Sequence, residues 1–508
     1  MAAHQITEEK KRPSHNKYAI SCTVLASMTS ILMGYDIGVM SGAALYIKEE
    51  LRITDVQLEI MSGMINLCAL VGSAMAGKTS DLVGRRYTMV IAGVIFFAGA
   101  LFMGFAPNYA LLVFGRFIAG VGIGFALVIA PVYAAEVAPA SSRGFLTSFP
   151  EVFINLGILL GYVSNVAFSK LPLHLGWRFM LGIGAVPSVF LAVVVIAMPE
   201  SPRWLVMQGR IGEAKCVLGK TSDSPQEAEQ RLADIKDAAG IAPECHDDVV
   251  TVNAHKSHGE GVWRELLISP TPTVRHVLIA VLSINFFQQA SGIDAVVLYS
   301  PRIFETAGIK TAEQKLLATV AVGIVKTLAI LVATFFLDKV GRRPLLLSSH
   351  GGMVVSLLLL ASSLTVVDHH MKDKVPQWAI VVCVAMVLIY VAFFSIGSGP
   401  IVWVYGTEVW PLRLRAQGAS LAVALNRVTS GVIGMTFLSL AHALTTGGAF
   451  FLFAGITTFS FILYYLILPE TLGKSLEETA SLFGSLTGWK AAAKELELKN
   501  KAEKGHQV

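Results

Sequence analysis

Six ionisable residues stand alone in long apolar stretches of the sequence, and they are the residues best placed to do chemistry. They are three acids and three bases, which permits complete pairing: Asp36, Glu151, Asp294, Arg116, Lys326 and Arg427. A charge at the centre of a membrane-spanning helix costs about 2.5–3.5 kcal/mol, so all six are expected to face a protein interior or a wet cavity. Such charges usually mark substrate or proton pathways. The alternative is a set of static ion pairs, which stabilise poorly because desolvation offsets the attraction.

Four uncharged polar or aromatic residues lie either close to two of these charges, Asp294 and Arg427, or in a bend-prone segment. They are Gln288, Gln289, Trp403 and Asn426. The two glutamines come just before Gly292, which can interrupt a helix and free backbone groups. Amides and carboxylates bond hydroxyl groups, and an indole covers a C–H face. The set therefore predicts a site for a polyhydroxylated ligand.

The elements that must position these residues are membrane-spanning helices. The chain is 54% hydrophobic and only 15% charged, whereas soluble chains carry about 25% charged residues. A helix needs roughly 20 apolar residues to cross a bilayer. Stretches of that length occur twelve times, approximately at 18–47, 56–76, 87–106, 109–134, 145–168, 176–198, 274–299, 314–337, 344–367, 377–405, 416–441 and 448–468. We therefore predict an all-α membrane protein with six spans on each side of a polar segment.

Short charged motifs occur twice in the same order, one copy in each half of the chain. The sequence DLVGRR at 81–86 returns as DKVGRR at 338–343, and such duplication in a membrane protein is typical of transporters. The motif residues are Asp81, Arg85, Arg86, Glu136, Arg143 and Glu200, with the copies Asp338, Arg342, Arg343, Glu408, Arg415 and Glu470. We expect ion-pair networks between helix ends here. The alternative is a plain topology signal, for which the arginines alone would suffice.

The placement of lysine and arginine predicts the orientation in the membrane. The N-terminal tail and the loops with the duplicated arginines are basic, whereas the loops on the other side are short and mixed. We therefore expect both termini in the cytosol. The predicted units are a cytosolic tail at 1–17, a six-helix half at 18–198, a cytosolic helical loop at 199–273, a second six-helix half at 274–468 and a cytosolic tail at 469–508. This bias explains the net charge of +5, which does not indicate nucleic acid binding.

Over about residues 18–480 the chain resembles the sugar porter family of the major facilitator superfamily, and within it the plant polyol/monosaccharide proton symporters. The motifs that carry the resemblance are the duplicated DxxGRR, the PESPRW and PET sequences that end the two halves, the Gln-Gln pair, Trp403 and the phrases GYDIGVMSGA, FPEVFIN and QQASGIDAVVLYSP. The resemblance implies the major facilitator fold, with two pseudo-symmetric six-helix halves plus cytosolic helices. It also implies that Asp36 accepts the coupled proton, that Arg116 is its partner, and that the duplicated motifs form a cytosolic gate.

The resemblance places ligand contacts at Glu151, Gln288, Gln289, Asp294, Lys326, Trp403, Asn426 and Arg427. Four of them depart from the family pattern. Relatives generally have Gln for Glu151, Asn for Asp294, a neutral polar residue for Lys326 and Trp for Arg427. We hypothesise that these extra charges pair with one another around the site, and that the added acceptors suit open-chain polyols. Alternatively, Glu151 or Asp294 is a second protonation site.

The expected function is proton-coupled symport of polyols (sorbitol, mannitol or xylitol type) and monosaccharides by alternating access, with the proton as coupling ion and no other cofactor. The nearest alternative is a facilitative sugar or inositol carrier without proton coupling. A nutrient sensor would need a longer signalling tail, and no nucleophile–base pair or metal cluster suggests an enzyme. The expected partners are the ligand and the lipid bilayer, with no nucleic acid and no obligate protein partner. The expected location is the plasma membrane.

Overall fold

The computed structural model describes residues 16–139, 143–238, 241, 248, 264–369, 376–410, 414–471 and 483. The side chains of Arg143, Gly144, Ala238, Arg264, Asp338, Thr407, Glu408, Arg415 and Ala416 lie outside this description. The described chain is helical and contains twelve spans long and apolar enough to cross a membrane. The prediction of an all-α protein with twelve membrane-spanning helices is thereby confirmed.

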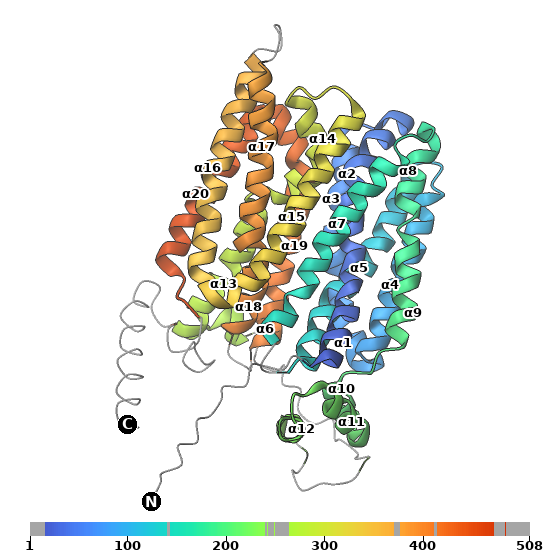
Figure 1. Ribbon diagram of the computed structural model, residues 1–508, viewed down its shortest axis with the longest axis vertical. Helices are drawn as coiled ribbons and strands as arrows, with labels where there is room; N and C mark the ends of the chain where they lie inside the picture. The colour runs from blue at the N-terminus through green and yellow to red at the C-terminus, as the bar shows by residue number, and fades with distance from the viewer. Residues whose placement is uncertain are drawn as a thin grey trace, which may run out of the picture.

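The first six spans, which we call the N-terminal half, gather on one side of the molecule (Figure 1). They consist of α1 (Lys17–Ser27), η1 (Met28–Ser30) and α2 (Ile31–Leu51), which together make one span, then α3 (Asp55–Val83), α4 (Arg85–Gly104), α5 (Tyr109–Val137), α6 (Arg143–Thr147) with α7 (Phe149–Phe168), and α8 (Leu173–Gly182) with α9 (Ala185–Ile196).

The last six spans form the C-terminal half. They consist of α13 (Pro272–Ala290) with α14 (Ile293–Thr306), α15 (Ala312–Val340), α16 (Arg342–His369), α17 (Gln377–Phe393) with η4 (Phe394–Ser398) and α18 (Gly399–Glu408), α19 (Arg415–Leu444), and α20 (Thr446–Ile467). Two spans are interrupted beside predicted site residues. Gly292 separates α13 from α14 with a positive φ of 90°, and η4 adds a wider turn before α18. Such breaks free backbone groups, which is tolerated where they line a cavity or are buried in protein.

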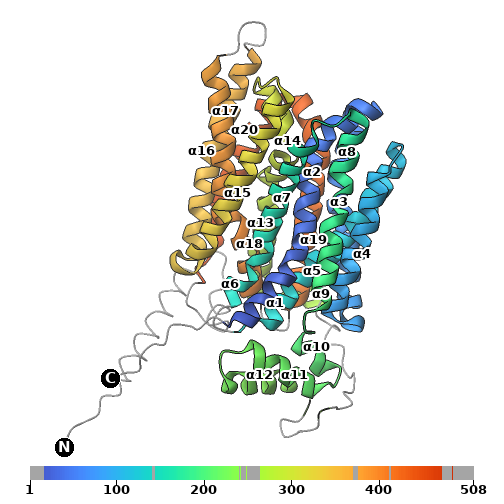
Figure 2. The same cartoon turned by 45° about the vertical axis from the view of Figure 1, so that its right-hand side comes forward.

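Three short helices, α10 (Pro202–Met207), α11 (Ile211–Thr221) and α12 (Pro225–Ala238), pack together at one end of the bundle (Figures 1 and 2). We call this the lower end and the opposite one the upper end. A further short segment, η3 (Arg264–Ile268), precedes α13. The guanidinium of Arg231 on α12 donates to the carbonyls of Glu136, Val137 and Ala138, each at 3.2 Å. A cation at the C-terminal end of α5 satisfies unpaired carbonyls and complements the helix dipole, so these helices are tied to the N-terminal half.

Local sequence signals explain where several spans begin. Asn16, Asn108 and Thr271 accept backbone N–H bonds at the starts of α1, α5 and α13. Thr54 and Gln57 form a complete capping box at the start of α3. Caps of this kind satisfy donors that a helix leaves unpaired, so they fix the ends of spans that carry site residues.

Candidate functional site

A cavity lies between the two halves, and most of the predicted ligand contacts line it. The N-terminal half supplies apolar side chains and one carboxylate, whereas the C-terminal half supplies amides, charges and two aromatic rings. The lining residues are Met33, Ile37, Leu127, Glu151, Ile154, Ile158, Gln288, Gln289, Ile293, Asp294, Val297, Lys326, Phe394, Trp403 and Arg427. The wall therefore combines apolar surface with donors and acceptors, as a ligand with both C–H and O–H groups requires.

Asn426 does not line this cavity but lies behind it as the centre of an amide cluster. Its Nδ2 donates to Gln288 Oε1 at 2.7 Å and to the Asn285 carbonyl at 3.2 Å. Its Oδ1 accepts from Gln289 Nε2 at 3.1 Å. Gln288 Nε2 donates to the Ser398 carbonyl at 2.9 Å, in the interrupted span. The buried Oε1 of Gln289 has no hydrogen-bond partner, so it is an acceptor available to a ligand hydroxyl.

The four extra charges do not pair with one another. In the described part of the chain, no two of Glu151, Asp294, Lys326 and Arg427 approach within the 4.0 Å of an ion pair. The two carboxylates have neutral partners instead. The hydroxyl of Ser430 donates to Asp294, and the side-chain amide of Asn155, one turn further along α7, donates to Glu151 at 3.3 Å. The hypothesis of direct mutual pairing is wrong, because neutral side chains, Ser430 for Asp294 and Asn155 for Glu151, take the place of the opposite charges.

Among the described residues, no carboxylate lies within ion-pair distance of the two cations of the cavity wall, Lys326 and Arg427. Lys326 Nζ lies 5.9 Å from the centroid of the Phe394 ring, within cation–π range. Charge attraction from Glu151 and Asp294 reaches it across longer distances. Trp403, on α18, lines the same wall near Glu151. The cavity thus holds balanced charge and offers donors from the cations and acceptors from the carboxylates.

Asp36 and Arg116 form a sealed ion pair beside the cavity, inside the N-terminal half. Arg116 Nη1 lies 3.0 Å from Asp36 Oδ2 and 3.1 Å from Oδ1, and Arg116 Nε donates to the Met61 carbonyl at 3.0 Å. The two side chains are 1% and 0% exposed, and neither lines the cavity. Ile37, next to Asp36, does line it. The pair is therefore buried inside the N-terminal half and is not exposed to the cavity.

The first copy of the duplicated motif forms a network at the lower end. Arg85 Nε lies 3.1 Å from Glu136 Oε2, and its Nη1 lies 3.2 Å from Asp81 Oδ1. Glu200 accepts the backbone N–H groups of Arg85 and Arg86 at 3.0 and 3.2 Å. Burial raises the pKa of the Glu200 carboxyl, and these N–H groups oppose the rise. All these residues belong to the N-terminal half or its lower extension, so the network ties α3, α4 and α5 to the segment after α9.

The second copy repeats this backbone geometry. Glu470 accepts the backbone N–H groups of Arg342 and Arg343 at 3.0 and 2.9 Å. The glycine before each arginine pair has the same left-handed φ, 100° at Gly84 and 101° at Gly341. Only a glycine adopts this conformation readily, and it turns the two N–H groups toward the carboxylate. The side chains of the remaining gate residues, Arg143, Asp338, Glu408 and Arg415, lie outside the described ones.

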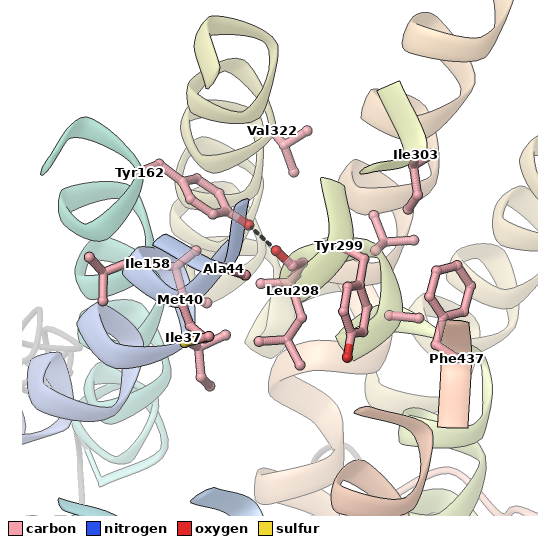
Figure 3. Close-up of a cluster of buried hydrophobic side chains, with 14 of the residues drawn as sticks. Ile37, Met40, Ala44, Ile158, Tyr162, Leu298, Tyr299, Ile303, Val322 and Phe437 are labelled. Carbon is pink, nitrogen blue, oxygen red and sulfur yellow. Dashed lines mark hydrogen bonds between the residues drawn. The ribbon is translucent and has the colours of Figure 1, made fainter. Parts of the chain in front are cut away.

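At the upper end, aromatic side chains join the halves above the cavity (Figure 3). The hydroxyl of Tyr162 on α7 donates to the Val297 carbonyl on α14 at 2.9 Å. Within the C-terminal half, Tyr299 donates to the Gly434 carbonyl at 2.6 Å and stacks on Phe437 with ring centroids 5.4 Å apart. Apolar residues of both halves surround this contact. These buried hydroxyls were not among the predicted site residues, since a lone tyrosine in an apolar span carries no distinct signal.

Glu59 is a further buried acid that the sequence analysis did not single out. It is 1% exposed on α3, and its carboxylate accepts the backbone N–H and the hydroxyl of Ser439 on α19 at 2.7 and 2.6 Å. Nearby, Asp55 contacts Lys48 and lies 3.9 Å from Arg302 and 3.6 Å from His442. The two acids therefore hold α3 of one half against α14 and α19 of the other at the upper end.

Glu59→Gln is expected to loosen the upper end, because an amide accepts more weakly than a carboxylate from both Ser439 groups. We expect an Ile37→Cys reporter in the cavity to react at least about threefold faster with a membrane-impermeant thiol reagent on the upper side. The control is Glu305→Gln, since the contacts of Glu305 to Arg302 and Lys315 stay within the C-terminal half. Equal labelling rates in the two variants would show that Glu59 does not hold the halves together.

Residues 22–483 match the model of a family described as sugar (and other) transporter. Polyol transporter 5 of Arabidopsis thaliana is 67% identical over 473 residues, which are 93% of this chain and 87% of that protein. The glucose transporter GlcP of Staphylococcus epidermidis is 34% identical over 91% of this chain and 96% of that protein.

Solved structures agree with the fold. The major facilitator proton:xylose symporter XylE bound to 6-bromo-6-deoxy-D-glucose has a TM-score of 0.75 and 26% identity, covering 92% of this chain and 100% of that chain. The inward open conformation of the xylose transporter XylE from E. coli has a TM-score of 0.72 and 25% identity, covering 92% and 100% of the two chains. The arrangement of helices described above is therefore the major facilitator fold.

Proposed function

The chain belongs to the sugar transporter family, and from this premise we propose that it carries polyols and monosaccharides across a membrane together with protons. The observation that carries the proposal is the sealed pair of Asp36 and Arg116 beside a cavity of mixed apolar and polar lining. A carrier without proton coupling has no need of a carboxylate buried next to its ligand site. Relatives named as polyol transporters and a structural relative named as a proton:xylose symporter support the same assignment.

Proton coupling follows from the chemistry of the pair. A carboxylate held against a guanidinium stays ionised, and separation of the two lets the acid take a proton. Once neutral, Asp36 no longer attracts Arg116, so α2 and α5 can move relative to each other. The proton thereby biases a two-state element of the N-terminal half. One charge that crosses the whole membrane potential supplies about 2.3 kcal/mol per 100 mV.

Ligand binding falls mainly to the C-terminal half. Gln289 offers a free acceptor, Lys326 and Arg427 offer donors, and Trp403 offers an aromatic face. Glu151 contributes an acceptor from the opposite wall. A polyol presents a hydroxyl at each carbon and needs such a set on several sides. In this proposal the ligand joins the two halves, and their rocking exposes it to one side of the membrane after the other.

The orientation proposed for the protein places its lower end in the cytosol. The duplicated arginines at this end obey the bias of basic residues toward the cytosol, and the proposed gate lies among them. Both termini and the segment 199–273 are then cytosolic. We propose the plasma membrane as the location, and we propose that the lower-end networks break and reform as the cavity opens inward.

The direct test is electrical. In a voltage-clamped cell that expresses the protein, sorbitol, mannitol, xylitol, inositol and glucose are applied in turn at pH 5.5 and 7.5, values chosen on either side of neutrality. We expect at least one of them to evoke an inward current that grows at the lower pH, because a proton enters with each ligand. Uptake of labelled ligand without current would identify an uncoupled carrier, and absence of both would contradict the whole assignment.

The added acids predict a change in ligand preference. Glu151→Gln and Asp294→Asn each replace an acceptor-only group with an amide that also donates. We expect the ratio of polyol to hexose uptake to fall about tenfold in at least one variant, the size of one charged hydrogen bond of about 1.5 kcal/mol. Competition of sorbitol against labelled glucose measures this ratio. An unchanged ratio in both variants contradicts the role of these acids in preference.

The same two variants test a second protonation site. If Glu151 or Asp294 also carried a coupled proton, its replacement would change the number of charges moved per ligand. Simultaneous recording of current and labelled uptake gives that number. We expect it to stay at the wild-type value in both variants, since the proposal assigns the coupled proton to Asp36 alone.

A further inference from the structure

Arg427 connects the two halves of the molecule at the wall of the cavity. From α19 of the C-terminal half, its Nη1 donates to Asn66 Oδ1 on α3 at 3.4 Å and approaches the Met33 sulfur on α2 at 3.9 Å. Its Nη2 donates to Asn426 Oδ1 at 2.5 Å. The side chain is 4% exposed. One guanidinium therefore bonds the amide cluster behind the ligand site and a helix of the opposite half.

The bonds of Arg427 suit a connection that must break in every transport cycle. Its acceptors are two neutral amides and a thioether, and no carboxylate lies within ion-pair distance of it in the described residues. A bond between a cation and a neutral acceptor is weaker than a buried ion pair. Its Nε has no partner, as is also true of Gln289 Oε1. Arg427 and Gln289 both line the cavity, so an unused donor and an unused acceptor lie in residues of its wall, where a small side-chain rotation would present them to a ligand hydroxyl.

Asn426 cannot respond to a ligand without affecting Arg427. Its Oδ1 already accepts from Gln289 and Arg427, and its Nδ2 already donates twice. A carbonyl oxygen has two lone pairs and an amide nitrogen two protons, so all four positions are filled. A ligand that draws Gln289 toward the cavity removes one of the two donors to Asn426 Oδ1, and the other donor is Arg427.

The opposite end of the connection lies beside the proton-binding pair. Met61, whose carbonyl accepts from Arg116 Nε, stands on α3 with Asn66, and Met33 stands one helical turn before Asp36 on α2. The two helices that Arg427 contacts are thus the helices that hold Asp36 and anchor Arg116. A shift of either helix changes both the proton-binding pair and the contacts of Arg427.

We propose that Arg427 is a positioning residue that links occupancy of the ligand site to the helices holding Asp36 and Arg116, with Asn66 as its acceptor in the N-terminal half. This inference rests on the proposed proton symport. With the cavity empty, the contact to Asn66 holds the halves together. A bound ligand engages Arg427 and Gln289, weakens that contact, and frees α2 and α3 to move when Asp36 changes its charge. Arg427 thereby makes proton movement conditional on ligand.

The test changes Asn66, which does not line the cavity, and leaves Arg427 in place. Purified wild type, Asn66→Ala and Asn66→Asp are reconstituted in liposomes, and labelled sorbitol is followed in two assays. One assay is accumulation driven by an imposed pH gradient, and the other is counterflow exchange without a gradient. Proton leak without sorbitol is recorded with a trapped pH dye. Ser188→Ala is the control, since Ser188 is also a buried polar residue of the N-terminal half, but its hydroxyl donates to the Ala185 carbonyl within its own helix α9.

Asn66→Ala is expected to raise the ligand-free proton leak at least fivefold and lower accumulation in proportion, with counterflow within twofold of wild type. Asn66→Asp is expected to slow counterflow at least tenfold, because a carboxylate would hold Arg427 in an ion pair. Ser188→Ala is expected to leave leak and counterflow near wild type per folded molecule. The inference is overturned if both Asn66 variants match Ser188→Ala, or if leak, accumulation and counterflow all fall together. Failure of wild type itself to accumulate sorbitol under the gradient would instead contradict the proposed symport.

Discussion

Asp36→Asn is expected to abolish uphill accumulation while sparing exchange of ligand across the membrane. Asparagine keeps the size of aspartate but takes no proton, so no charge can enter with the ligand. The carboxylate that Arg116 Nη1 contacts at 3.0 Å would be replaced by a neutral amide. A potential of 100 mV acting on one charge sustains about a fiftyfold gradient. The steady-state ratio of inside to outside ligand should therefore fall from that order to one.

Two assays on the same preparation separate this result from simple loss of protein. Accumulation is measured under an imposed proton gradient, and counterflow is measured with labelled ligand against an unlabelled excess inside. Asp368→Asn, at the end of α16 and away from the cavity, should leave both assays unchanged. If Asp36→Asn still accumulates ligand, another residue carries the proton. If wild type and Asp36→Asn both exchange ligand but neither accumulates it, the protein is an uncoupled carrier.

The spans and the positions of the lone charges could be predicted from the sequence because both follow from one-dimensional patterns. An apolar run of sufficient length has few alternatives in a membrane protein, and a single charge within it must turn inward. Glu151, Asp294, Lys326 and Arg427 do line one cavity, as their isolation suggested. The breaks at Gly292 and before α18 likewise follow residues that disfavour a continuous helix.

Contacts across the cavity could not be predicted in the same way. The sequence gives the helix on which a charge stands, but neither the distance between helices nor the neutral partners available. Asp294 takes a bond from Ser430, and Arg427 bonds Asn66 and Asn426, so the expected mutual pairing is replaced by amides and a hydroxyl. Hydroxyls and amides are too common in these spans for the sequence alone to identify those that bond the buried charges.

Glu59 and Asn426 show two other limits of prediction from sequence. Glu59 stands near the start of its span, where charges are ordinary, so its burial against Ser439 carried no signal. Asn426 was expected among the ligand contacts from the family resemblance, together with its neighbour Arg427, yet successive residues of a helix point about 100° apart. It therefore lies behind the glutamines. In both cases helix rotation and depth decide the role, and these depend on packing.

That packing is tightest where α2 crosses α7, next to the proton-binding pair. A Cβ atom added at Gly38 would lie 2.3 Å from the Ile158 carbonyl oxygen, and one added at Gly161 would lie 2.5 Å from the Val39 nitrogen. Both obstacles are backbone atoms, which cannot rotate away as a side chain can. Small residues let helix backbones approach in membranes, where packing rather than the hydrophobic effect drives association. The crossing therefore fixes the position of Asp36, two residues before Gly38.

Gly38→Val is accordingly expected to remove most of the folded protein. Overpacking costs about 1–3 kcal/mol even when side chains can adjust, and here the two helices must separate. We expect at least about a tenfold loss of monodisperse protein, the effect of roughly 1.4 kcal/mol, measured by size-exclusion chromatography of a fluorescent fusion. Gly77→Val on α3 is the matched control, because a Cβ there meets nothing within 4 Å. Comparable yields of the two variants would show that α2 and α7 can separate without unfolding. Asp36 would then be held by its bond to Arg116 rather than by the helix crossing.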